Sequence, residues 1–295
     1  MLPCYPLEPA SRIIYVYTMT LSDRNNCLKA GILIAAGAMV LMIIASFHII
    51  RAYPDVSAGM TRRSTGILQF LVVHAFKPVP YVPFVSMVSS VLYALITIIS
   101  IYYFFEKTPS PEILFFALFV ISFAFEGSRI MVPLKLIYGF SNVYLIMASR
   151  VLFFGRYFGI FSLFAASVYA AGLEVQKPLN IIFIIALATL VITLGIPIDG
   201  LSWDSSLIMI SGYTAMFNMV EAGIVLITMV SFFISAYSRG TKAYIFISIG
   251  SLMVFLGRNI LLSADTWISP APGLLLLALG TRFICTELHQ VYLWL

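Results

Sequence analysis

The sequence predicts an all-α fold, a polytopic transmembrane helical bundle of about eight spans. Of the 295 residues, 61% are hydrophobic and only 10% are charged, and the mean hydropathy is +1.03. Soluble domains carry roughly 25% charged residues. The apolar runs are unbroken over about 20 residues, which is the length of a spanning helix, whereas barrel strands alternate over segments of about ten. We therefore expect one N-terminal helix followed by a seven-helix core.

Eight stretches meet the length and hydropathy requirement for a span. They cover residues 30–50, 82–105, 112–132, 142–171, 179–198, 213–237, 243–263 and 272–294. Residues 1–29 are more polar and predict an N-terminal tail, followed by a single membrane domain over 30–295. The apolar piece at 66–76 is too short to span alone and predicts an interfacial or re-entrant helix. Since proline disrupts helix interiors, we expect the third span to end at Pro133.

The charges of the connecting loops predict an orientation. Positive residues favour the cytoplasmic side of short loops. One set of loops holds Lys107, Lys177, Arg239 and Lys242, and the opposite set holds Lys135 with Asp199, Asp204 and Asp265. This four-to-one balance places the turn at 238–242 in the cytoplasm and predicts a multi-pass protein of the cell inner (cytoplasmic) membrane. The connection at 51–81 carries four positive residues on the other side, so the orientation of the N-terminal helix stays open.

Seven charged residues lie inside the predicted spans and are the candidate site. They are Glu126, Arg129, Arg150, Arg156, Glu221, Arg258 and Arg282. A charge at that depth costs several kcal/mol by insertion scales, so such groups rarely persist without partners. At a rise of about 1.5 Å per residue, five different helices place these charges in the membrane half nearest the Asp204 loop. We predict that they converge on one polar cavity open to the outside.

The sum of these charges favours a ligand. Five positive and two negative groups leave a surplus of three positive charges. Arginine presents a planar fork suited to carboxylate or phosphate and keeps its proton. The sequence therefore predicts a binding or transport site for a small anionic ligand or a lipid phosphate. Trp203 and Asp204 in the outer loop are expected to be interface anchors or lids over this cavity.

Sequence neighbours of the charges predict close helix packing around them. Four of the five arginines follow a glycine by one or two positions, namely Gly127, Gly155, Gly257 and Gly280. Small residues let helix backbones approach one another. Residues three, four or seven apart share a helix face, which pairs Glu126 with Arg129 and Asn218 with Glu221, and groups Arg282 with Thr286 and His289.

Two alternatives need no ligand. Glu126, Arg129 and Glu221 could form ion pairs that only fix helix register, and Arg129 and Arg258 could extend toward lipid headgroups.

Two further function classes also stay open. One is a sensor or scaffold subunit whose basic turn at 238–242 contacts a cytoplasmic partner protein; the architecture resembles the membrane halves of bacterial seven-helix sensor proteins. The other, ranked third, is a lipid-phosphate enzyme with Glu126 or Glu221 as base.

The absence of chemical motifs argues against an enzyme. The sequence contains no HExxH, GxSxG or P-loop pattern. Cys4, Cys27 and Cys285 form no CxxC pair, and the three histidines are scattered. We therefore assign no catalytic residue, metal site or cofactor. No basic face remains for nucleic acid, so the expected partners are membrane lipids, a small anion and a cytoplasmic protein.

Overall fold

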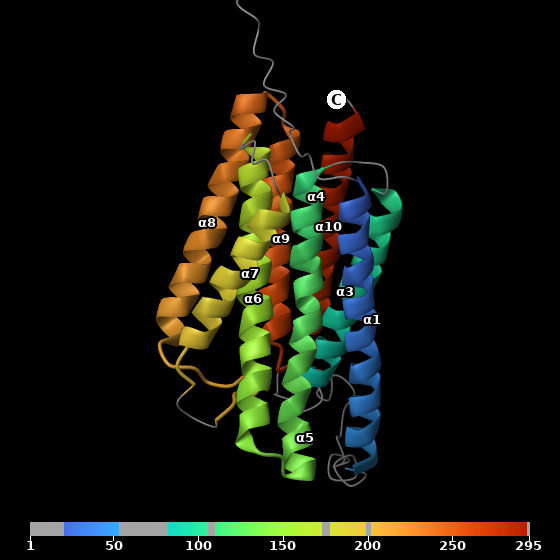
Figure 1. The fold of residues 1–295 in the computed structure, drawn as a ribbon, viewed down its shortest axis with the longest axis vertical. Helices are drawn as coiled ribbons and strands as arrows, with labels where there is room; N and C mark the ends of the chain where they lie inside the picture. Colours follow the sequence, from blue (N-terminus) through green and yellow to red (C-terminus); the bar gives the residue numbers. More distant parts are fainter. Residues whose placement is uncertain (1–20, 53–81, 106–109, 173–177, 199–201, 294–295) are drawn as a thin grey trace, which may run out of the picture.

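The computed structural model describes residues 21–52, 82–105, 110–172, 178–198 and 202–293, and these form an α-helical bundle (Figure 1). The elements in chain order are α1 (Leu21–Ala52), α3 (Val82–Phe104), α4 (Pro111–Ile121), the 3₁₀ helix η2 (Ser122–Ile130), α5 (Met131–Tyr138), α6 (Asn142–Ala170), α7 (Pro178–Gly195), α8 (Thr214–Arg239), α9 (Ala243–Leu262) and α10 (Pro270–Leu293). Eight continuous helical segments in these ranges are long and apolar enough to cross a membrane. The predicted all-α, eight-span class is confirmed, and the chain is a multi-pass membrane protein.

The third span, formed by α4, η2 and α5, lies at the centre of the bundle. Every residue of α4 from Glu112 to Ile121 is buried, whereas α7 buries only four of its residues. Ser110 begins α4, because its side chain accepts a hydrogen bond from the backbone N–H of Ile113 and Pro111 follows at the first helical position. Apart from Glu112 the helix is apolar on every side, and a helix that is buried all round is typical of a bundle centre. Exposed apolar side chains on α1, α7 and α8 lie on the outer surface of the bundle.

The prediction that the third span ends at Pro133 is wrong. Its middle is wound as a 3₁₀ helix from Ser122 to Ile130, and α5 begins afresh at Met131 and continues to Tyr138. Pro133 is the third residue of α5, in the first turn after the 3₁₀ segment, and the helix continues past it. Gly139 ends α5 in the left-handed conformation, with φ of 64°.

The first helix begins nine residues earlier than predicted. Polar residues from Leu21 onward belong to α1, so part of the expected tail is helical. Asp23 lies in the first turn, where the helix dipole favours a negative charge, and Arg24 is buried and donates to the side chain of Asn25. Residues 1–20 and the apolar piece at 66–76 lie outside the described residues.

Glycines bring α9 and α10 into close contact. A Cβ added to Gly257 would lie 2.8 Å from the carbonyl oxygen of Gly273, and one added to Gly280 would lie 2.7 Å from that of Gly250. Two glycines seven residues apart on α9 thus face two on α10. The predicted close approach is confirmed here and also at Gly155, where an added Cβ would lie 2.5 Å from the Cβ of Phe125.

The connections alternate between the two ends of the bundle. The turn between α8 and α9 lies at the end opposite the connection from α7 to α8 (Figure 1). Arg239 therefore lies at one end, and Asp204 lies at the other. The cytoplasmic assignment of the Arg239 end remains a prediction from loop charge.

Candidate functional site

A fully buried ion pair joins η2 to α9. Arg258 Nε donates to Glu126 Oε1 at 3.0 Å, and the two side chains are 1% and 0% exposed. The face of the guanidinium lies 4.9 Å from the ring centroid of Phe123, within cation–π range. In a 3₁₀ helix, residues three apart are eclipsed, so the winding of η2 aligns Phe123, Glu126 and Arg129 along one edge.

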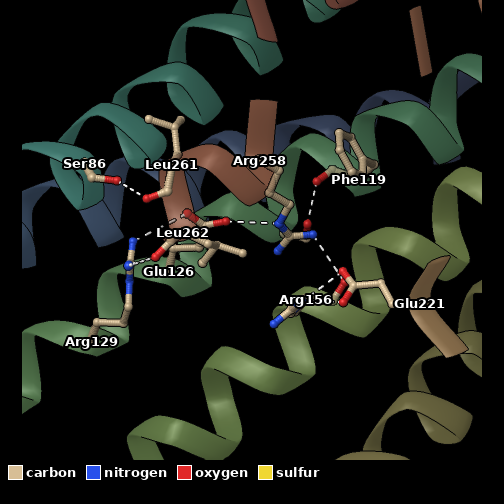
Figure 2. Close-up of polar contacts among 10 residues, drawn as sticks. Ser86, Phe119, Glu126, Arg129, Arg156, Glu221, Arg258, Leu261 and Leu262 are labelled. Atoms are coloured by element: carbon tan, nitrogen blue, oxygen red, sulfur yellow. Dashed lines mark hydrogen bonds and ion pairs between the residues drawn. The ribbon is translucent and has the colours of Figure 1, made fainter. Parts of the chain in front are cut away.

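Arg129 extends this network to the loop before α8. Its Nη2 lies 3.9 Å from Glu126 Oε2, and its Nη1 donates to the backbone carbonyls of Ser206 and Leu262 at 3.2 and 3.0 Å. Leu262 is the last residue of α9, whose carbonyl end carries partial negative charge. Arg129 therefore shares one carboxylate with Arg258 and obtains its other contacts from backbone oxygens (Figure 2).

A second ion pair joins α6 to α8. Arg156 binds Glu221 through the Nε–Nη2 edge of its guanidinium, at 3.1 Å from Nε to Oε1 and 2.5 Å from Nη2 to Oε2. Asn218, one turn earlier on the same face of α8, accepts from Nη2 at 3.5 Å. Arg258 Nη1 donates to the backbone carbonyl of Arg156 at 3.2 Å, which links the two pairs (Figure 2). The network thus runs through η2, α9, α6 and α8.

Two of the seven predicted residues do not join this network. Arg150 points to α7, where its Nη1 donates to the carbonyls of Thr193 and Leu194 at 3.1 and 2.8 Å. These are among the last carbonyls of α7, so Arg150 caps that helix end. Arg282 is exposed on α10 and forms no hydrogen bond or ion pair with any residue in the described ranges. The expected convergence therefore holds for Glu126, Arg129, Arg156, Glu221 and Arg258 but is wrong for Arg150 and Arg282, since each faces a different neighbour.

A cavity of about 480 Å³ adjoins the second ion pair. Its polar lining comprises Arg156, Asp204, Ser211, Thr214, Asn218, Glu221, Asn259 and Ser263, and its aromatic lining comprises Phe153, Tyr157, Phe217 and Phe255. Arg156 is 21% exposed and Glu221 only 3%. We call this the α6–α8–α9 cavity. Its size and mixed apolar and polar lining are typical of small-molecule sites.

Asp204 is positioned by its own loop. Its Oδ1 accepts from the backbone N–H groups of Ser206 and Ile208 at 3.0 and 2.9 Å, and the backbone of Trp203 pairs with that of Met209. This carboxylate lines the cavity and lies close enough to interact electrostatically with Arg129. The expectation that the loop contributes to a lid over the cavity agrees with this placement.

The charge balance differs from the predicted surplus of three positive charges. The five converging residues sum to one positive charge, three arginines against two glutamates. Asp204 brings that sum to zero. The cavity itself is lined by one arginine and two carboxylates, so the accessible charge there is not positive. Exclusion of Arg150 and Arg282 and inclusion of Asp204 account for the whole difference.

The network contains buried polar atoms that form no hydrogen bond. Among the described residues these include Glu126 Oε2, Arg129 Nε and Nη2, and Arg258 Nη2. The ion-pair interpretation of Glu126, Arg129 and Glu221 agrees with the geometry. The alternative in which Arg129 and Arg258 extend to headgroups is wrong, because both side chains are buried inside the bundle. No group of three His, Cys, Asp or Glu side chains in the described ranges could hold a metal ion.

A polar group at the opposite end of the bundle was not predicted. Glu112 is buried on α4, where Ser110 donates to its Oε2 at 2.9 Å and the hydroxyl of Tyr292 on α10 donates to the same oxygen. Arg239 nearby donates to the hydroxyl of Tyr244 at 2.8 Å. The sequence signal was a carboxylate directly after Ser110-Pro111, which reads as an ordinary helix start.

The fold and the network together define a polytopic helical membrane protein with an internal salt-bridge network beside a cavity. Comparison with known proteins finds no matching family model, no matching curated protein and no matching solved structure.

Proposed function

We propose that this protein binds a small ligand in the α6–α8–α9 cavity, through an anionic group at Arg156 and a cationic group between Asp204 and Glu221. The observation that carries the proposal is that one guanidinium, that of Arg156, and two carboxylates, those of Asp204 and Glu221, line the same cavity. The hydrogen bonds of Arg156 to Glu221 and Asn218 use Nε and Nη2, which leaves the Nη1 donors for a ligand. A purely anionic ligand would meet two carboxylates at the same wall.

The ligand is therefore a zwitterion rather than the simple anion expected from the charge sum. Phosphoethanolamine has this chemistry, either as a free molecule or as the headgroup of a phospholipid. The aromatic residues Tyr157 and Phe217, whose ring centroids lie 6.2 Å apart, supply apolar walls and faces attractive to an ammonium group. The cytoplasmic membrane of a cell is the proposed location, with the cavity on the outer side.

Binding alone, as in a sensor, is better supported than transport. The large core cluster of Phe115, Phe116, Phe119, Phe123 and their neighbours packs the third span with buried apolar side chains. A carrier would need a polar route past them. Uptake of labelled phosphoethanolamine into proteoliposomes tests this distinction, and the proposal expects binding without accumulation.

The test of the site is calorimetry with the purified full chain in detergent. We expect phosphoethanolamine to bind more tightly than inorganic phosphate or ethanolamine alone. Arg156→Gln should weaken that binding by at least about tenfold, because a charged hydrogen bond is lost. Arg150→Gln is the matched control and should change nothing, since Arg150 does not line the cavity.

Two outcomes contradict the proposal. If phosphate and phosphoethanolamine bind with equal affinity, the ligand does not need a cationic group. If Arg156→Gln binds phosphoethanolamine as tightly as the wild type, the ligand does not bind at Arg156. Nanodiscs of phosphatidylethanolamine and of phosphatidylglycerol distinguish the sources: competition by the first lipid alone indicates a lipid headgroup as the occupant, whereas no competition indicates a free ligand.

A further inference from the structure

The exposed arginine of α10 lies at the middle of its span. Arg282 is twelve residues after Pro270 and eleven before Leu293. At a rise of about 1.5 Å per residue it is about 18 and 16 Å from the two helix ends. The hydrocarbon core is about 30 Å thick, so Arg282 lies near its centre. Arginines that lie near helix ends reach the headgroups by snorkelling, but Arg282 lies far from both ends.

The inner face of α10 explains why Arg282 points outward. Gly273 and Gly280 contact the backbone of α9, and Thr281 forms a hydrogen bond with Tyr93 on α3. With those positions fixed against neighbours, Arg282 falls on the opposite side, together with the exposed residues Leu275, Leu279 and Thr286. This outer face of α10 is apolar at Leu275 and Leu279, and its polar groups are Thr286, His289 nearer the C-terminal end, and the one full positive charge of Arg282.

We infer that the outer face of α10 is the docking surface for a transmembrane helix of a different protein, one that carries an aspartate or glutamate at mid-membrane depth. Charge complementarity selects this occupant. Intramembrane arginines pair with an opposite charge or with backbone carbonyls, and the mid-span carbonyls of a partner helix are already used by its own hydrogen bonds, which leaves a carboxylate as the group it can offer. The flanking Leu275, Leu279 and Thr286 offer a packing stripe along the same face, and small or polar groups assist helix association in lipid.

A second copy of this chain fits the surface poorly. In a parallel twofold dimer centred on α10, the two Arg282 side chains would meet at the same depth and repel. Of the carboxylates in the described spans, Glu112, Glu126 and Glu221 are buried. Asp23 lies in the first turn of α1 and not at mid-membrane depth, and Glu287 lies five residues farther along α10 on a different face. A lipid phosphate is disfavoured by depth alone.

The inference is tested with synthetic helices of known sequence. The full chain is labelled with a donor fluorophore and reconstituted in phosphatidylcholine vesicles. Acceptor-labelled polyleucine helices of about 20 residues carry a central Asp, Asn or Leu. We expect energy transfer to show at least about tenfold tighter association of the Asp helix than of the Leu helix.

Variants of Arg282 show whether its charge causes the preference for the Asp helix. Arg282→Leu should remove the preference for the Asp helix, and Arg282→Lys should retain it because the charge stays. Arg150→Leu is the matched control, an arginine lost from elsewhere in the membrane half, and should behave as wild type. The cavity lies on α6, α8 and α9, so failure here leaves the phosphoethanolamine experiment unaffected, and the reverse also holds.

Three results overturn the inference. One is equal association of all three helices. A second is energy transfer between two copies of the protein that Arg282→Leu abolishes, since the occupant would then be a second copy. A third is a fall in the melting temperature of the isolated monomer on Arg282→Leu, since an acidic group of the same chain, such as Glu8 or Asp55, would then be the partner.

Discussion

Arg258 on α9 and Glu126 on η2 form an ion pair at 3.0 Å that is closed to solvent and to lipid. Both residues also interact with a second group of opposite charge or polarity: Glu126 with Arg129, and Arg258 with the backbone carbonyl of Arg156. This pair therefore connects the central span to α9 and, through Arg258, to α6.

Loss of one member of the pair should destabilise the fold strongly. Arg258→Leu leaves Glu126 buried with only the more distant Arg129, and breaking a buried pair costs about 3–5 kcal/mol. The double variant Glu126→Leu/Arg258→Leu removes both charges and should lose less. The free energy of unfolding in mixed detergent micelles measures this, and additive losses in the double-mutant cycle would show that the two residues are not coupled.

Bulk added between α9 and α10 should also destabilise the protein. Gly280→Ala places a Cβ 2.7 Å from the carbonyl oxygen of Gly250, a backbone atom that cannot rotate away. We expect a loss of about 1–3 kcal/mol from overpacking. Gly223→Ala on α8 is the control, because nothing lies within 4 Å of its added Cβ, and it should be neutral or slightly stabilising. A Gly280→Ala variant as stable as Gly223→Ala would contradict the packing.

Arg150 should matter to α7 and not to binding. Arg150→Gln loses contacts to the carbonyls of Thr193 and Leu194, and cationic caps at helix ends contribute about 0.3–2 kcal/mol. Hydrogen exchange at the end of α7 should quicken while phosphoethanolamine affinity stays constant. An affinity loss equal to that of Arg156→Gln would instead bring Arg150 into the site.

The Glu112 contact should contribute to stability at the other end of the bundle. Tyr292→Phe removes a hydroxyl donor from a buried carboxylate, at a cost of about 1–3 kcal/mol. Tyr103→Phe is the matched control, because that tyrosine on α3 is 73% exposed. Thermal unfolding of the two variants should therefore differ, and identical melting temperatures would contradict a role for this hydrogen bond.

The orientation predicted from loop charge can be tested by labelling. In a chain with Cys4, Cys27 and Cys285 replaced by serine, Ser205→Cys should react with a membrane-impermeant maleimide on intact cells. Thr241→Cys, in the turn between α8 and α9, should react only after permeabilisation. The reverse pattern would invert the protein and place the cavity on the cytoplasmic side.

The sequence predicted the spans well, because a bilayer requires about 20 apolar residues whatever the tertiary fold. It also predicted that Gly155, Gly257 and Gly280 bring helices together and that Asn218 and Glu221 share a face, but it did not predict the partner glycines Gly250 and Gly273. It wrongly ended the third span at Pro133, because no nearby residue indicates that the preceding segment is a 3₁₀ helix.

The site was predicted in part for a related reason. Depth along a span can be counted from the sequence, but the direction of a side chain around its helix depends on the neighbours. Arg150 and Arg282 have the depth expected of network members and yet face α7 and the outside. Asp204 is in a loop and Glu112 is at a helix start, so neither resembled an intramembrane charge. Backbone carbonyls as partners of Arg129 have no side-chain signature in the sequence at all.

The nine-residue 3₁₀ winding from Ser122 to Ile130 has a mechanical consequence. Three residues make a full turn there, whereas three α-helical residues fall about 60° short of one. If the segment relaxed to an α-helix, Arg129 would rotate away from Glu126 by that angle and the span would shorten by about 4 Å. The alignment of Glu126 with Arg129 is therefore coupled to the rise per residue of the central span, so a force that changes one must change the other.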